Sequence, residues 1–221
     1  MPSAVKRGRP PQKGLAERRR EEILRVATSL FASAGYACTD LQDVADKLGI
    51  GKGTLYRYFP TKQALFHAAV ERAIMGMQSA IDAAIARLTE PLDRIGCAVR
   101  AYLGYFDRNP ECIELLMQER AQFPERKKPK YFEHREANRG AWEKLYRDLI
   151  AQGYFRDIPV QRITDTVGAL VYGAMFTNYF AGRRKGLAEQ AEDILDVVFN
   201  GLLTQTGKDH RRLAAAKERE S

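Results

Sequence analysis

Cysteine is scarce in this sequence, and the few cysteines form no motif. The 221 residues include only Cys38, Cys97 and Cys112, which are far apart and odd in number, and no CxxC occurs. No disulfide framework is therefore implied. We expect small buried hydrophobic residues at these positions, with Cys38 the one candidate for redox sensing.

Catalytic and metal-binding patterns are also missing. Neither GxSxG nor HExxH occurs, and His67, His134 and His210 are isolated, whereas a metal site needs ligands at fixed spacing. The glycine-rich stretch 49–54 superficially resembles a phosphate loop, but Lys52 is followed by glycine rather than Ser or Thr, and a helical pattern precedes it. We therefore expect no enzyme activity, no metal and no cofactor.

Long apolar runs are absent as well. The longest uncharged stretch, residues 166–182, has 17 residues and contains three glycines and Asn178. A membrane span needs about 20 predominantly apolar residues. The basic N-terminus has no apolar run behind it, so it does not match a secretory signal. These features predict a cytoplasmic protein with no membrane partner.

Basic charge is abundant but confined to one part of the chain. The net charge is +8; residues 1–65 carry 12 basic and 6 acidic side chains, and the rest carry 24 and 22. A localised basic surface is typical of a protein that binds phosphate groups. The composition therefore predicts an acidic partner for the first third of the chain.

Apolar residues recur with helical spacing through most of the chain, and no alternation of strand length occurs. A first helix runs from about Glu17 until Gly35 ends it. Thr39 and Gln42 have the spacing of a capping box that opens a second helix. A third helix, near 53–59, ends before Pro60, and Thr61 can cap a long fourth helix. Further helices are predicted near 91–107, 111–122, 131–152, 160–181 and 187–204. The fold class predicted is all-α with about nine helices.

The second and third predicted helices are short, and only residues 49–52 separate them. Two helices joined by a tight glycine-containing turn are typical of a helix-turn-helix, whose second helix presents polar side chains to the DNA major groove. Leu55 and Phe59 should face inward, and the outward side chains are those of Lys52, Thr54, Tyr56, Arg57 and Tyr58. The alternative is a three-helix core with a solvated polar face.

These residues resemble a known family. Similarity at fixed spacing to the DNA-binding domain of TetR/AcrR-type transcriptional regulators is carried by Gly35-Tyr36, Thr39, Asp43-Val44-Ala45, Gly49-Ile50, the run 53–59, Lys62 and Leu65. The resemblance is specific over residues 17–66, and the later part agrees only in helix count and length. It implies a homodimer with an operator-binding domain and a helical domain that dimerises and binds a small-molecule effector. Members of the family typically repress transcription and release DNA when the effector binds.

The resemblance also implies roles for individual residues. Lys52, Thr54 and Arg57 match positions that face bases or the groove, and Gly53 lets backbone N–H groups approach a phosphate. Contacts to the DNA backbone are implied for Thr39, Tyr56, Tyr58 and Lys62. Gln42 is suited to a base edge, but the capping box also claims its side chain, and both readings stay open. The chain departs from the family pattern at Asp40, Gly51 and Gln63.

Residues 1–15 form a predicted basic arm. The stretch 6–11, Lys-Arg-Gly-Arg-Pro-Pro, looks like the core of an AT-hook, in which Arg7 and Arg9 would insert into a narrow minor groove. The alternative is a solvated basic tail that only raises non-specific affinity. The basic stretch 126–130 is expected to be a solvated loop rather than a second DNA site.

The last two predicted helices suggest a dimer interface and an effector pocket. Small residues at four-residue spacing let two helices approach closely, and the next helix presents apolar residues on one face. The predicted interface is Ala169, Gly173, Thr177, Ala181, Ile194, Val198 and Leu202. An aromatic stripe either lines a pocket or forms ordinary core, and the predicted pocket residues are Phe66, Tyr102, Phe106, Met117, Trp142, Tyr172, Met175, Phe176 and Tyr179.

The sequence therefore predicts a ligand-responsive transcriptional repressor that binds a palindromic operator in double-stranded DNA as a homodimer. A hydrophobic or aromatic molecule is the expected effector. The expected domains are an arm (1–15), a helix-turn-helix domain (16–62), an effector and dimerisation domain (63–205) and a charged tail (206–221). The alternative is a ligand-blind architectural DNA-binding protein that uses the arm. A function of another class, an all-helical enzyme, is disfavoured because the sequence contains no catalytic constellation.

Overall fold

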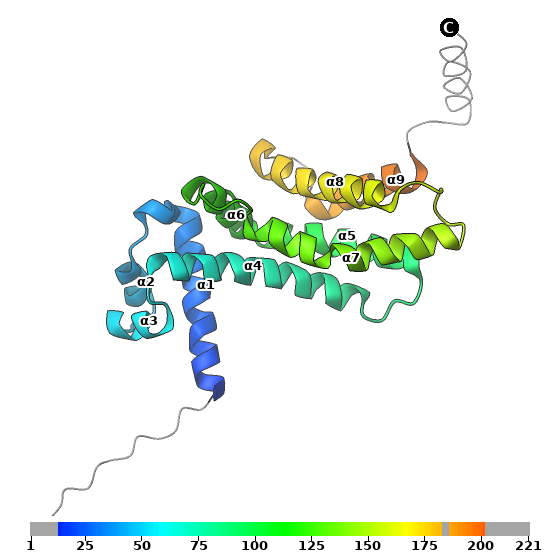
Figure 1. Cartoon of the computed structure of the whole chain (residues 1–221). Coiled ribbons are helices and arrows are strands. Elements are labelled where there is room, and N and C mark those ends of the chain that lie inside the picture. The colour runs from blue at the N-terminus through cyan, green and yellow to red at the C-terminus, as the bar shows by residue number, and fades with distance from the viewer. Residues whose placement is uncertain (1–12, 183–185, 202–221) are drawn as a thin grey trace, which may run out of the picture. The chain divides into compact units, whose positions relative to one another are not determined.

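A computed structural model describes residues 13–182 and 186–201, and over these residues the chain consists of helices without strands (Figure 1). This confirms the predicted all-α class, and the predicted helices correspond one to one with those observed. Their bounds are α1 Lys13–Cys38, α2 Leu41–Lys47, α3 Lys52–Tyr58, α4 Lys62–Ile85, α5 Pro91–Arg108, α6 Pro110–Gln122, α7 Lys130–Ala151, α8 Val160–Ala181 and α9 Leu187–Asn200.

Local signals explain where most of these helices begin and end. Gly35 adopts φ 84° and ψ 157°, and this geometry interrupts α1 near its end. A positive φ of this kind suits glycine best. The hydroxyl of Thr61 accepts a hydrogen bond from the Ala64 N–H at 3.0 Å and so caps α4 as predicted. The C-cap of α8 is Gly182, in the left-handed conformation.

The capping box predicted for α2 was wrong in its residues. Asp40, not Thr39, is the N-cap, and it forms a reciprocal capping box with Asp43 rather than with Gln42. Asp40 has extended backbone geometry (φ −97°, ψ 146°), as an N-cap requires. The helix therefore begins one residue later than the Thr39 pattern implied.

The chain divides into two compact units. Over the described residues, the first comprises 13–80 and 108–141, and the second comprises 81–107, 142–182 and 186–201. This division groups α6 with the N-terminal helices. Figure 1 shows how long α4 and α7 are, and each of these helices contributes to both units.

Each unit has its own apolar core. In the first unit, Ile23 and Phe31 of α1, Leu55 of α3, and Leu65 and Phe66 of α4 are all inaccessible to solvent. In the second unit, Ile95, Tyr146, Leu149, Val160 and Ile163 form a buried cluster. Burying one large apolar side chain contributes about 1.5–3 kcal/mol. Among the described helices, none is both long and apolar enough to cross a membrane.

Candidate nucleic-acid interface

The helices α2 and α3 pack through apolar residues and are joined by a tight turn. Leu41, Val44 and Ala45 of α2 and Leu55 of α3 are buried. Gly49 takes φ 62° in the turn, and the N–H of Ile50 donates to the Ala45 carbonyl at 3.0 Å. The turn therefore satisfies the C-terminal carbonyls of α2 while it redirects the chain into α3.

One face of α3 is open and polar. Lys52, Gly53, Tyr56 and Arg57 are exposed, and Thr54 and Tyr58 are half-buried. Leu55 and the following Phe59 are buried on the opposite side, as predicted. A helix of this kind fits the major groove of B-DNA, which is about 12 Å wide, with cations and hydroxyls directed outward.

Gly51, the N-cap of α3, provides no side-chain capping bond. The N–H groups of Thr54 and Leu55 donate to the Gly51 carbonyl at 2.8 and 3.3 Å. An uncapped helix N-terminus keeps backbone N–H groups available to an anion. Glycine has no side-chain acceptor that could cap these groups.

Asp40 links α2 to α3. Its carboxylate accepts the Gln42 backbone N–H at 2.7 Å and lies 3.6 Å from the Lys52 ammonium. The Gln42 hydrogen bond, followed by the charge of Lys52, lowers the pKa of Asp40 below its usual value. Asp40 lies where phosphate contacts are expected, but its carboxylate caps α2 and pairs with Lys52 at the start of α3.

Thr39 and Gln42, both predicted to contact DNA, have different surroundings. Thr39 is 3% exposed, and its hydroxyl donates to the Gly35 and Leu30 carbonyls at 2.8 and 3.3 Å. The Gln42 side chain is free of the capping box and donates to Asp46 at 2.7 Å on the outer face of α2. Base contact by Gln42 and phosphate contact by Thr39 remain predictions, and the Thr39 hydroxyl already has an internal role.

Lys62 lies at the start of α4. Its ammonium donates to the Ala37 carbonyl at 2.9 Å and lies 4.8 Å above the centre of the Tyr36 ring. A lysine ammonium has three N–H donors, so one internal bond leaves others for a phosphate. The predicted phosphate contact is compatible with this geometry, and Lys62 also ties α4 to the end of α1.

Sequence reasoning missed Gln118 of α6. The side chain is 9% exposed and contacts backbone groups of α1 in the first unit. The only signal in the sequence was a polar residue within an apolar helix face, after Leu115 and Leu116. That pattern does not identify a partner more than 80 residues away.

The predicted pocket residues are distributed over both units. Tyr102 and Phe106 have ring centres 5.2 Å apart, and the Tyr102 hydroxyl donates to the Met175 sulfur at 3.7 Å. Tyr172 and Phe176 pair on α8 at 4.8 Å. Tyr179, which is 37% exposed, contacts Phe180, and Phe180 stacks on Phe176. Trp142 packs on the buried cluster of the second unit, and Phe66 and Met117 belong to the first unit.

Phe66 contributes to an aromatic cluster in the first unit. Its ring contacts those of Phe31, Tyr36 and Phe123, with centres 5.1, 5.0 and 5.7 Å apart. It is completely buried. Its observed contacts are therefore those of a core residue beside the end of α1.

The predicted dimer stripe lies on an open face of α8. Ala169, Gly173, Thr177 and Ala181 are exposed, and so are the larger Leu170 and Phe180. On α9, Ile194 and Val198 are half-buried, and Val197 and Phe199 are exposed. Arg7 and Arg9 of the predicted arm, and Leu202 of the predicted interface, lie outside the described residues.

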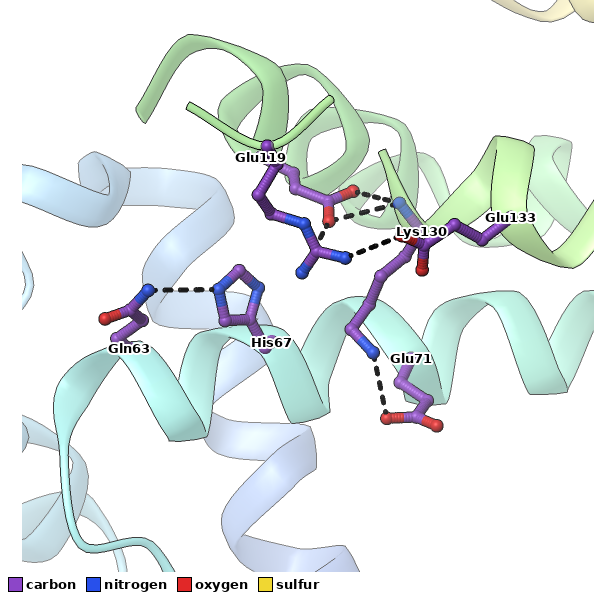
Figure 2. Close-up of polar contacts among 7 residues, drawn as sticks. Gln63, His67, Glu71, Glu119, Lys130 and Glu133 are labelled. Carbon is purple, nitrogen blue, oxygen red and sulfur yellow. Dashed lines mark hydrogen bonds and ion pairs between the residues drawn. The ribbon is translucent and has the colours of Figure 1, made fainter. Parts of the chain in front are cut away.

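The basic loop after α6 is engaged in ion pairs (Figure 2). Arg126 contacts Glu119 and Glu133, Lys128 pairs with Glu136, and the Lys130 ammonium donates to Glu71 at 3.4 Å. These contacts agree with a local structural role for the loop. Cys38 is exposed at the end of α1, Cys97 is half-buried and Cys112 is buried.

Comparison with known families matches both parts of the chain. Residues 23–69 match the family described as "Bacterial regulatory proteins, tetR family", and residues 88–176 match a "Tetracyclin repressor-like, C-terminal domain". The first match contains α2, α3 and the start of α4, and therefore the whole open face described above.

Three relatives illustrate the similarity. The chain is 24% identical over 194 residues to the transcriptional regulator HbdR of Aromatoleum sp. (strain CIB), covering 88% of this chain and 85% of HbdR. It is 29% identical over 166 residues to the transcriptional repressor KstR2 of Mycobacterium tuberculosis, covering 69% and 80%. It is 26% identical to the transcriptional activator FasR of Mycolicibacterium smegmatis, but spans only 47% of that relative.

The fold is also similar to that of a solved relative. The structure described as the ketosteroid transcriptional regulator KstR2 of Mycobacterium tuberculosis aligns with a TM-score of 0.63 and 20% identity, covering 85% of this chain and 96% of that one. At this level of identity, the match supports the shared architecture.

Proposed function

The chain belongs to the TetR family of bacterial transcriptional regulators, and we propose that it represses transcription as a homodimer on a palindromic operator until a small molecule releases it. The observation that carries the DNA-binding part is the open face of α3. Exposed Lys52, Tyr56 and Arg57 stand opposite the buried Leu55. This arrangement anchors the helix by one side and leaves cations and hydroxyls for a DNA groove on the other.

Roles within this face follow from side-chain chemistry. Arg57 reads a base edge, because its guanidinium can donate two hydrogen bonds to guanine. Tyr56, which is 43% exposed, contacts the DNA backbone through its hydroxyl. Lys52, Gly53 and Thr54 lie at the first turn of α3, close to the groove, and Tyr58 and Lys62 contribute phosphate contacts at its far end.

The homodimer forms through the open faces of α8 and α9. One reading helix covers only a few base pairs, so useful specificity requires two copies held about one helical turn of DNA apart. The exposed small residues of α8 permit close approach of a second helix, and Leu170, Phe180, Val197 and Phe199 supply apolar area around them. A group of large exposed apolar side chains is typical of a protein interface when the residues form one patch.

The effector is a hydrophobic or aromatic molecule that binds among the C-terminal helices. Tyr102, Phe106 and Met175 lie together in the second unit and are apolar except for one hydroxyl. KstR2 is described as a ketosteroid regulator, and a compact apolar effector of that general character would suit such side chains. A mainly apolar lining with a few polar groups is typical of small-molecule sites.

A footprint upstream of the protein's own gene, followed by anisotropy titration of the protected sequence, tests the DNA-binding part. We expect a protected inverted repeat that binds with one dimer per site. A thermal-shift screen of small hydrophobic compounds then tests the effector, because a ligand of the folded state raises the melting temperature. A compound that raises it must also release the operator. Failure of every stabilising compound to release DNA would contradict the effector mechanism.

A further inference from the structure

The interruption of α1 at Gly35 breaks the regular helical path of the backbone. The φ of 84° turns the chain away from the helical path. A buried N–H or carbonyl without a partner costs about 1–3 kcal/mol. The partners of the groups around this break therefore show what holds the path of the chain into α2.

Gln118 of α6 bonds to both sides of the break. Its amide nitrogen donates to the Phe31 carbonyl at 2.9 Å, and its amide oxygen accepts the Tyr36 N–H at 2.8 Å. The same nitrogen donates to the Glu114 carboxylate at 2.9 Å, which fixes the orientation of the amide. Gln118 of α6 therefore holds the carbonyl of Phe31, before Gly35, and the N–H of Tyr36, directly after it.

The segment that follows the break leads directly to the reading helix. Thr39 returns its hydroxyl to the Gly35 carbonyl, and Lys62 of α4 holds the Ala37 carbonyl. The next residue, Asp40, caps α2 and pairs with Lys52 of α3. The bonds made by Gln118 thus lie at the start of a short, continuous series of contacts that ends on the DNA-facing surface.

Glu119, the residue after Gln118, connects α6 to the start of α7. Glu119 is 1% exposed, and both of its oxygens accept the Lys130 backbone N–H at 3.2 Å, at the first residue of α7. Figure 2 shows the Glu119 carboxylate directed toward that nitrogen. Consecutive buried polar residues of α6 therefore hold the start of α7 and the end of α1.

We infer that Gln118 is a positioning residue that couples α6 to the DNA-reading helices. Its amide sets the direction in which the chain leaves α1, and so the placement of α2 and α3; a shift of α6 that breaks the two bonds to α1 lowers operator affinity. This inference rests on the proposed DNA-binding function. It adds a specific residue through which the helices beyond the reader act on it.

The test begins with the full-length protein free of DNA. Gln118→Met keeps the length and approximate volume of the side chain but removes both bonds. We expect amide hydrogen exchange of residues 36–48 to quicken by about tenfold or more, because local opening becomes easier when one buried and one part-buried bond are lost. Exchange in the core of α4 should stay unchanged. Gln118→Asn, which keeps the amide but shortens its reach, should give an intermediate rate.

Gln190→Met is the matched control. Gln190 is also a buried glutamine, 5% exposed, and its amide donates to Asn178 at 2.6 Å in the second unit. Its replacement removes a comparable bond far along the sequence from the reading helices. Exchange should quicken in α8 and α9 and remain at the wild-type rate over residues 36–48.

Operator affinity completes the test. Gln118→Met should bind the footprinted operator about tenfold more weakly, within the usual range of coupling between sites. Gln190→Met, once sedimentation shows that it is still a dimer, should bind like the wild type. Unchanged exchange over residues 36–48, or a uniform increase through the whole first unit, overturns the inference. So does local quickening with wild-type operator affinity. If the wild type binds no operator, the proposed function fails, while the exchange data still decide whether Gln118 holds the segment.

Discussion

The reading helix α3 and the helix α8 each leave one face open, but the two faces carry opposite chemistry. The open face of α3 presents Lys52, Tyr56 and Arg57. That of α8 presents Ala169, Gly173, Leu170 and Phe180, with no charged side chain from 166 to 182. Both helices bury their other side against their own unit. The chemistry that remains outside is the basis for the proposed partners: phosphates and bases for α3, and another apolar helix for α8.

The difference also separates two kinds of energy. Contacts between cations and phosphates depend strongly on salt, because they release counterions. Contacts between apolar helices depend on buried area and close packing, and hardly on salt. The proposed binding of an operator by a dimer requires both kinds of contact, so changes on each face should weaken it in distinguishable ways.

The largest effect is expected from Gly173→Leu on α8. Among the described residues, no atom outside the local helix backbone lies within 4 Å of a Cβ built at Gly173, so we expect the fold to tolerate the larger side chain. In a dimer it should force the helices apart, at a cost of roughly 1–3 kcal/mol or more. We expect monomers in sedimentation at micromolar concentration and loss of palindromic operator binding.

Gly140→Leu on α7 is its control, because Gly140 is exposed, helical and equally free of neighbours around a Cβ. That variant should remain dimeric. A Gly173→Leu protein that also stays dimeric and binds its operator would show that the open face of α8 is not the interface.

The next largest effect is expected from Arg57→Ala on α3. Loss of a bidentate base contact costs about 1–3 kcal/mol and relaxes specificity at one operator position. Competition titrations with single-base operator variants measure both quantities. Arg87→Ala, an exposed arginine between α4 and α5, is the control and should leave affinity and base preference unchanged. Equal weakening on every sequence would instead assign Arg57 to a phosphate.

A smaller, sequence-independent effect is expected from Lys62→Ala. If the ammonium contacts a phosphate, the slope of log affinity against log salt should fall by about 1. Because Lys62 also donates to the Ala37 carbonyl, the salt slope separates the DNA contact from this internal bond. An unchanged slope with weaker binding at every salt concentration would leave Lys62 only the internal role.

The smallest effect is expected from the buried carboxyl group of Glu119, which belongs to neither open face. Burial raises the pKa of Glu119 despite the hydrogen bond from the Lys130 backbone. The folded state then holds the proton more tightly than the unfolded state, so the free energy of unfolding falls as pH rises from the ordinary carboxyl range through the raised pKa. Denaturant titrations should show this loss in the wild type and not in Glu119→Gln.

Glu136→Gln provides a control of opposite sign. Glu136 is exposed, and its hydrogen bond with Lys128 lowers the pKa of the carboxyl. The stability that this pair adds is present above the ordinary carboxyl pKa and is lost as pH falls. If Glu119→Gln lost stability with rising pH as the wild type does, the dependence would belong to other groups.

Much of the fold could be predicted because its signals are local. Gly35, Pro60 and Thr61 act within a few residues of the helix ends that they mark, and helical spacing of apolar residues identifies the buried side of each helix. The outward face of α3 followed from the same pattern, since a buried Leu55 requires Tyr56 and Arg57 to point elsewhere. Errors arose where two local signals competed, as at Thr39 and Asp40, which both have N-cap chemistry.

By itself, the sequence determined the helices, the basic first third and the polar outward face of the reading helix, because composition and short-range spacing suffice for these. Only the tertiary structure decided that Lys62 bonds to a carbonyl 25 residues away and that Gln118 reaches α1 across 82 and 87 residues. Such bonds depend on which backbone groups a break leaves unpaired and on which side chain the packing brings near them. The spacing of residues along the chain indicates neither the unpaired backbone groups nor the side chains that lie near them.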